Sequence, residues 1–252
     1  MKKLIVSGCS WTKYSMGMTM EPYLRDKDWA THLAKKLDME CINLGCGGAG
    51  NEYIFFSIYD ELMREKKHSE IGLVVVMWSG WKRWDFELKN YVPISEDRLE
   101  NIANSWRRPP ARVREDLLKL DFTPWKKSLR YIYMFQELME QNNIPYMHVQ
   151  GVRPDWHQFS GRHKAPLMEE GIIEEKLRNI YVDKINEDKF IGWPPFLELG
   201  GMYMDWYLNE LDPNEDKLYL PHSSTSAHPN AEGDKVISNY LYEKIREEYG
   251  NL

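Results

Sequence analysis

The order of apolar and polar positions along the chain predicts strands that alternate with helices. Four short apolar runs are typical of strands: residues 3–7, 40–44, 71–78 and 145–150. Four segments carry apolar residues at helical spacing: residues 28–37, 52–65, 131–141 and 231–249. Such alternation favours an α/β fold, because parallel strands need helical crossovers that cover the sheet. We therefore expect a three-layer α/β/α sandwich with a mainly parallel central sheet, of the flavodoxin-like kind.

The apolar pattern also predicts which side chains face the core. The run at residues 71–78 is almost continuously apolar, as expected of a central strand that is buried on both faces. In the helix at residues 52–65, Ile54, Ile58, Leu62 and Met63 are predicted to point inward.

Two segments interrupt this alternation. Residues 81–125 are polar, contain proline and are rich in arginine, and residues 155–219 contain glycine, proline, many aromatics and a charged helix-like stretch around 169–180. We expect one domain over residues 1–252, with both segments inserted above the carboxyl ends of the strands. Open α/β sheets bind their ligands at that edge.

Composition narrows the class of protein. The chain has 252 residues, of which 42% are hydrophobic and 29% charged, as in ordinary globular proteins. A net charge of −6 argues against a nucleic-acid partner, and no apolar run approaches the ~18 residues of a membrane span. The three cysteines have no metal-ligand spacing and no signal segment is evident, so we expect a cytoplasmic protein without metal or cofactor. Export by a lysis or secretion route that uses no signal peptide is the alternative.

Aromatic residues are more numerous than a core of this size requires. The chain contains 10 Trp and 15 Tyr. A surplus of this kind lines a groove for sugars or planar ligands in some proteins and fills a bulky core in others. The sequence leaves both interpretations open.

Three polar signals fall where strands end or a helix begins. Ser10 follows the first strand, the glycine-rich segment 45–50 follows the second, and His228 directly precedes the last helix. A serine hydroxyl becomes a nucleophile when a base removes its proton, and histidine has a suitable pKa. Backbone N–H groups of a glycine turn can then stabilise the resulting oxyanion. Together these signals predict an esterase-like active site.

Residues 8–12 and 227–233 resemble the SGNH (GDSL-type) hydrolases, a family of esterases, lipases and carbohydrate acetylesterases with a three-layer α/β fold. The resemblance implies that Ser10 is the nucleophile and His228 the general base. It also implies that the backbone N–H groups of Ser10 and Gly48 bind the oxyanion. Gly48 is identified by counting five residues from Asn43, and its near alternatives are Gly47 and Gly50.

The chain departs from the family pattern in three places. Cys9 stands where the family has Asp. The family's Gly-x-Asn-Asp motif is replaced by residues 78–83, which contain no Asn, so that Ser79 could supply a hydroxyl donor instead. Thr225 stands at the position of the acid that orients the histidine, which leaves a Ser–His dyad unless a carboxylate from elsewhere takes over. Candidates for such a carboxylate are Asp155, Asp205 and Asp212.

These signals favour one activity and leave two alternatives open. The expected substrate is a small acetyl-like ester, carried on a carbohydrate, and the substrate-binding residues are expected to be Trp11, Asn51, Arg83 and Asp155. Arg83 has the alternative of a solvated loop residue. A relative without hydrolytic activity, acting as a glycan acyltransferase or a carbohydrate-binding protein, is the first alternative. Phosphate binding at residues 45–50 is the second. The sequence does not determine the oligomeric state.

Overall fold

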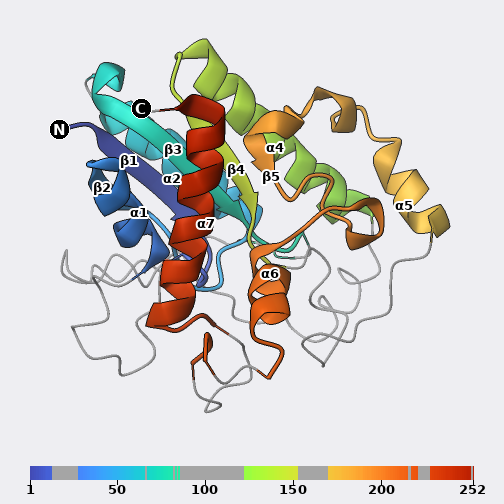
Figure 1. Cartoon of the computed structure of the whole chain (residues 1–252). Coiled ribbons are helices and arrows are strands. Elements are labelled where there is room, and N and C mark those ends of the chain that lie inside the picture. The colour runs from blue at the N-terminus through green and yellow to red at the C-terminus, as the bar shows by residue number, and fades with distance from the viewer. Residues whose placement is uncertain are drawn as a thin grey trace, which may run out of the picture.

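In the computed structural model of the protein, five parallel strands form the central sheet (Figure 1). The structure describes residues 1–12, 28–65, 67–81, 83, 85, 122–152, 170–214, 217–220, 228–250 and 252. The strand order is β2-β1-β3-β4-β5, and every neighbouring pair is parallel. The chain therefore changes direction across the sheet between β1 and β3, which is where open α/β sheets form a crevice. The strands are β1 (Lys3–Gly8), β2 (Glu40–Asn43), β3 (Ile71–Trp78), β4 (Tyr146–Gln150) and β5 (Phe190–Ile191).

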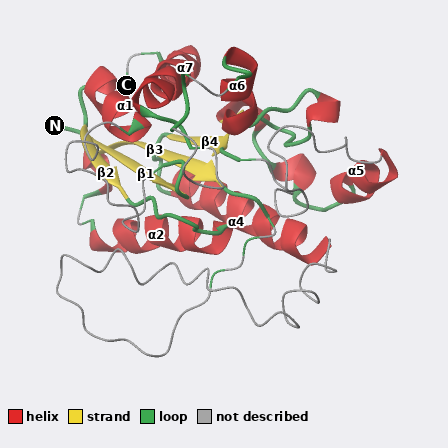
Figure 2. Cartoon of the chain, turned by 90° about the horizontal axis from the view of Figure 1, so that it is seen from below, coloured by secondary structure: helices red, strands yellow, loops and turns green. Residues whose placement is uncertain are grey.

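Helices cover both faces of this sheet. Figure 2 shows α1, α6 and α7 on one side of the strands and α2 and α4 on the other. The expected three-layer α/β/α architecture is therefore confirmed. The helices are α1 (Trp29–Leu37), α2 (Asn51–Arg64), α4 (Phe122–Gln141), α5 (Glu170–Leu177), α6 (Met204–Leu211) and α7 (Ala231–Tyr249), and the short 3₁₀ turns are η2 (His68–Glu70), η5 (Val182–Lys184), η6 (Glu187–Lys189) and η7 (Leu197–Leu199).

Two elements differ from the expected organisation. Helix α4 begins at Phe122, nine residues before the predicted start at 131 and inside the segment 81–125 that we expected as an insertion. Strand β5 lies inside the second expected insertion, 155–219, yet it pairs with β4 as the edge of the central sheet. Its two residues are too few to show a period in the sequence. Part of that segment thus completes the sheet.

Strand β3 and five tryptophans are prominent in the core. All eight residues of β3 are buried, as expected for a central strand. Tryptophans 11, 29, 78, 81 and 125 are each at most 4% exposed, so these five belong to the core rather than to an open groove. The prediction for Met63 is wrong, because its side chain is 59% exposed. Leu62 fills the inner face of α2, and the next residue is turned about 100° away from it.

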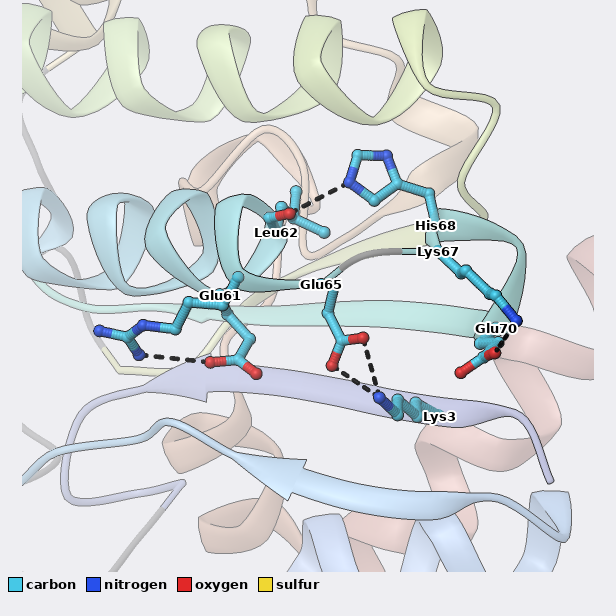
Figure 3. A network of polar contacts seen from close by, with 8 residues as sticks. Lys3, Glu61, Leu62, Glu65, Lys67, His68 and Glu70 are labelled. Atoms are coloured by element: carbon cyan, nitrogen blue, oxygen red, sulfur yellow. Dashed lines mark hydrogen bonds and ion pairs between the residues drawn. The ribbon is translucent and has the colours of Figure 1, made fainter.

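A network of charged residues lies at the end of the sheet opposite the carboxyl ends of the strands (Figure 3). Lys3 at the start of β1 forms an ion pair with Glu65 at the end of α2, with Nζ 2.7 Å from Oε1. Nearby, the Nε2 atom of His68 lies 3.1 Å from the carbonyl oxygen of Leu62. The ion pair connects the end of α2 to β1, and the His68 contact connects it to the turn before β3. None of the described helices has the length and apolarity that crossing a bilayer requires.

Candidate active site

Ser10 lies in a tight turn directly after β1. The N–H of Thr12 donates to the carbonyl of Cys9 at 2.8 Å, which closes the turn around Ser10. The carbonyl of Thr12 in turn accepts a hydrogen bond of 3.0 Å from the side-chain amide of Asn43, at the end of β2. The turn that presents the Ser10 hydroxyl is therefore anchored to the neighbouring strand rather than left as a free loop.

His228 is held by a short antiparallel pairing just before α7. Residues Tyr219 and Pro229 form an isolated bridge. On either side of it, the N–H of Leu220 donates to the carbonyl of His228 and the N–H of Asn230 donates to the carbonyl of Leu218, both at 2.9 Å. This pairing fixes the backbone that carries the imidazole.

Asn230 joins this pairing to the helix. Its side-chain oxygen accepts from the N–H groups of Glu232 (2.9 Å) and Gly233 (3.0 Å), which caps the N-terminus of α7. Its side-chain nitrogen donates to the carbonyls of Lys217 (2.8 Å) and Tyr219 (3.0 Å). One amide thus orients both the helix and the strand-like segment beside His228.

The two segments bring the imidazole of His228 onto the hydroxyl of Ser10. The Nε2 atom of His228 lies 2.7 Å from the Oγ atom of Ser10. This distance suits direct proton transfer between a nucleophile and its base. The ring of Trp11 is 2% exposed and lies against the imidazole, with ring centroids 6.4 Å apart. Trp11 therefore bounds the pair on one side.

The glycine-rich segment after β2 is bound to the end of β1. The N–H of Cys46 donates to the carbonyl of Gly8 at 2.9 Å, and the N–H of Gly45 donates to the side-chain oxygen of Asn43 at 2.9 Å. Gly48 has a φ of +82°, a conformation that favours glycine. Within the part of the chain that is described, the backbone N–H groups of Ser10 and Gly48 donate to no protein acceptor. Both residues are half-buried.

Ser79 and Asn51 are paired with each other at the carboxyl end of β3. The N–H of Ser79 donates to the side-chain oxygen of Asn51 at 2.8 Å. The side-chain nitrogen of Asn51 donates to the carbonyl of Ser79 (3.2 Å) and to the hydroxyl of Ser128 (3.0 Å). Asn51, expected to bind substrate, is 5% exposed and makes these bonds within the protein. The Ser79 hydroxyl is buried and has no hydrogen-bond partner among the described residues.

Farther along the same loop, Asp85 binds the N-terminus of α2. Its two carboxylate oxygens accept from the N–H groups of Gly50 (2.8 Å) and Tyr53 (2.9 Å). Burial raises the pKa of the Asp85 carboxyl, while these two N–H groups act in the opposite direction. No sequence signal singles out Asp85, because it lies in a polar segment without periodicity. The guanidinium of Arg83 donates to the carbonyl of Ala49 at 3.3 Å.

The position of the Asp85 carboxylate argues against the alternative of phosphate binding at residues 45–50. The N–H groups at the start of a helix attract anions, and here a side chain of the protein already occupies them. A phosphate at residues 45–50 would meet the negative charge of Asp85. The arrangement therefore disfavours phosphate binding at this turn.

The candidate acids have other described roles. One carboxylate oxygen of Asp212 accepts from the N–H groups of Lys217 (2.9 Å) and Leu218 (2.8 Å), and thereby supports the segment paired with His228. Asp205 accepts from the N–H of Trp206 at 2.9 Å. Asp155 and Thr225 lie outside the described residues. No cluster of metal-ligating side chains occurs in the described ranges.

The chain has the α/β/α fold of esterases of the SGNH type, as comparison with solved structures confirms. It matches TesA with a TM-score of 0.52 and 11% identity, over 98% of this chain and 99% of TesA. It matches the psychrotrophic esterase EstA from Pseudoalteromonas sp. with a TM-score of 0.51 and 13% identity, over 99% of this chain and 100% of EstA.

A third match is a catalytic mutant of Axe2, an acetylxylan esterase from Geobacillus stearothermophilus. Its TM-score is 0.51 at 10% identity, over 97% of this chain and 94% of Axe2. No family model and no curated protein sequence matches the chain. At such identities the likeness establishes the fold, and the function has to be argued from the site.

Proposed function

We propose that the protein is a serine esterase that hydrolyses a small acyl ester, with Ser10 as nucleophile and His228 as general base. The observation that carries this proposal is the 2.7 Å distance between Ser10 Oγ and His228 Nε2. The contact lies at the carboxyl edge of the parallel sheet, which is where α/β proteins bind their ligands. A chance contact between two surface residues would not be expected at that edge.

The chemistry follows from this geometry in two steps. Ser10 Oγ attacks the ester carbonyl carbon while its proton passes to His228 Nε2. The tetrahedral intermediate then expels the alcohol, which takes that proton, and leaves an acyl group on Ser10. Water attacks the acyl group in the second step, giving its proton to His228. Release of the carboxylic acid restores the Ser10 hydroxyl.

The negative charge on the intermediate requires donors that already point toward it. The N–H groups of Ser10 and Gly48 suit this role, because neither donates elsewhere within the described residues. Each such donor contributes ~3–4 kcal/mol to transition-state stabilisation. The unpartnered hydroxyl of Ser79 would be a third donor to a substrate oxygen that reaches it.

We propose an acetyl-like group on a carbohydrate as the substrate. Axe2, which shares the fold, is named as an acetylxylan esterase. Arg83 beside the glycine-rich segment would border the bound ester. Trp11, which is 2% exposed, would act on the substrate only through its packing against the imidazole. Asp155 stays a predicted substrate-binding residue.

An acyltransferase is the second candidate, because Thr225 replaces the family's orienting acid and residues 78–83 contain no Asn. A carboxylate can contribute ~10⁴ in rate to a triad that depends on it. An acyl-enzyme that water attacks slowly could still pass its acyl group to a sugar hydroxyl. A protein that only binds carbohydrate would form no acyl-enzyme.

The test is covalent labelling of Ser10 by a fluorophosphonate, together with hydrolysis of p-nitrophenyl acetate. We expect labelling and turnover in the unaltered protein and neither in the Ser10→Ala variant. Ser238→Ala is the matched control, because it removes from α7 a buried hydroxyl that has no partner in the described part of the chain. Equal turnover in Ser10→Ala would refute the proposal. Labelling with slow hydrolysis but fast transfer to an added sugar would identify the transferase.

A further inference from the structure

The loop after β3 and the glycine-rich segment after β2 are bound to each other by side chains. At one end Asn51 bonds both backbone groups of Ser79, and at the other Arg83 donates to the carbonyl of Ala49. Asp85 adds two further bonds, to the N–H groups of Gly50 and Tyr53. Gly48 directly precedes the first of these contacts, at Ala49.

Asp85 caps a helix that lacks a cap of its own. The N-cap residue of α2 is Gly50, which has no side chain to accept from the first turn of the helix. The carboxylate that takes this role comes from a residue 35 positions later in the chain. A local Ser or Asp at position 50 would cap the helix equally well. A cap from the β3 loop additionally ties that loop to the glycine-rich segment.

We propose that Asp85 is a positioning residue of the oxyanion site. By holding the N–H of Gly50, it fixes the peptide backbone two residues beyond Gly48 and so keeps the Gly48 N–H directed at the substrate carbonyl. This proposal rests on the esterase function proposed above, since the Gly48 N–H is an oxyanion donor only in that reaction. Asp85 itself touches no reacting atom.

If Asp85 only stabilised the fold, restoring the cap on α2 from another residue would restore activity as well. A pair of variants therefore distinguishes this structural role from the positioning role. Asp85→Ala removes both the cap on α2 and the link between the β3 loop and the glycine-rich segment. The double variant Asp85→Ala/Gly50→Asp restores a cap on α2 from position 50 without restoring that link. Position 50 accepts a side chain conformationally, with φ −91° and ψ 177°. A Cβ atom there would lie 2.6 Å from Asp85 Oδ2 in the unaltered protein, a contact that Asp85→Ala removes. It would also lie 3.2 Å from the carbonyl oxygen of Arg83, which has to shift by a few tenths of an ångström.

We expect Asp85→Ala to lower both the melting temperature and kcat, with kcat falling ~10²-fold, the effect of a small misplacement of a catalytic group. KM should change little, because the lost contact matters in the transition state. The double variant should regain the melting temperature but not kcat. Recovery of both would overturn the proposal, as would an Asp85→Ala variant with unchanged kcat.

Amide hydrogen exchange provides a readout that does not require turnover. Asp85→Asn preserves the side-chain shape and serves if Asp85→Ala does not fold. Faster exchange at residues 48–53 is expected in Asp85→Asn, and unchanged exchange there would contradict the positioning role. If the unaltered protein neither hydrolyses p-nitrophenyl acetate nor reacts with the fluorophosphonate, the esterase proposal fails, while exchange still reports whether Asp85 orders this segment.

Discussion

The Nε2 atom of His228 lies 2.7 Å from the Oγ atom of Ser10, although 218 positions separate the two residues in the sequence. The turn after β1 and the bridge before α7 hold the two backbones independently of each other. The contact is therefore imposed by the fold on both sides, and it can be tested from either side.

Replacing His228 by Gln should abolish base catalysis while the protein stays folded. General base catalysis contributes ~10²–10⁴ in rate, so kcat for p-nitrophenyl acetate should fall by that factor, and fluorophosphonate labelling of Ser10 should slow equally. His68→Gln is the control, because His68 lies at the far end of the sheet (Figure 3). A His228→Gln variant that labels at the normal rate would show that another group activates Ser10.

The two functions of the Asn230 amide can be separated. Asn230→Ala loses the cap of α7 and both donors, so the free energy of unfolding should fall by ~1–2 kcal/mol, and kcat should fall as well. Asn230→Asp keeps the cap but places an acceptor against the carbonyls of Lys217 and Tyr219. We expect it to lose kcat with a smaller loss in urea unfolding than Asn230→Ala. Unimpaired turnover in Asn230→Asp would mean that His228 does not depend on this amide.

A methyl group at Gly48 should affect activity more than stability. With φ at +82°, Ala at this position is strained by ~1–2 kcal/mol, and relief of the strain rotates the peptide that carries the N–H. Gly200→Ala is the matched control, because Gly200 has φ +80° and open space around its Cβ position. Both variants should lose similar stability on heating, but only Gly48→Ala should lose kcat. Equal kcat in the two would exclude Gly48 as a donor.

Acid should destabilise the fold through His148, which is completely buried in β4. Burial lowers the pKa of this imidazole to about 3, and its Nδ1 atom accepts from the Trp78 indole at 3.0 Å. The unfolded chain, with a histidine pKa of 6.5, binds the proton that the folded protein excludes. Stability is therefore fully present above pH 6.5 and declines as the pH falls toward 3, by on the order of 4 kcal/mol from this group.

His148→Gln should flatten this dependence, because its amide oxygen can accept from Trp78 and has no proton to bind. The measurement is urea unfolding at pH 7, 5.5 and 4.5 for both proteins. An identical slope in His148→Gln would contradict the prediction.

Much of the sheet could be predicted from the sequence because its strands and helices have strong periods. Strand β3 and helix α7 have the bounds that their patterns predict. Strand β5 could not be predicted, since two residues show no alternation and the pairing with β4 supplies the evidence for it. The early start of α4 was missed for a related reason. The residues before Tyr131 include a proline, two lysines and an arginine, which read as the end of a polar insertion.

The site divides in the same way. Ser10 and His228 were predicted because each follows or precedes a regular element, and the structure places them in contact. The sequence assigns Asn43 no role beyond marking the position of Gly48, whereas in the structure its side-chain amide connects the Ser10 turn to the glycine-rich segment. Asp85 was missed altogether, because a helix cap supplied from 35 positions away leaves no local signal. Long-range polar contacts of this kind emerge from packing and have no period to detect.

The Ser10–His228 contact joins two segments that are held by separate parts of the fold. Cleavage of the chain between Leu220 and His228 would leave β1 and its turn in place, while the two sides of the antiparallel bridge beside Pro229 would lose the covalent connection between them. On the proposed function, a protein cut there would lose activity to the extent that the imidazole moves away from Ser10.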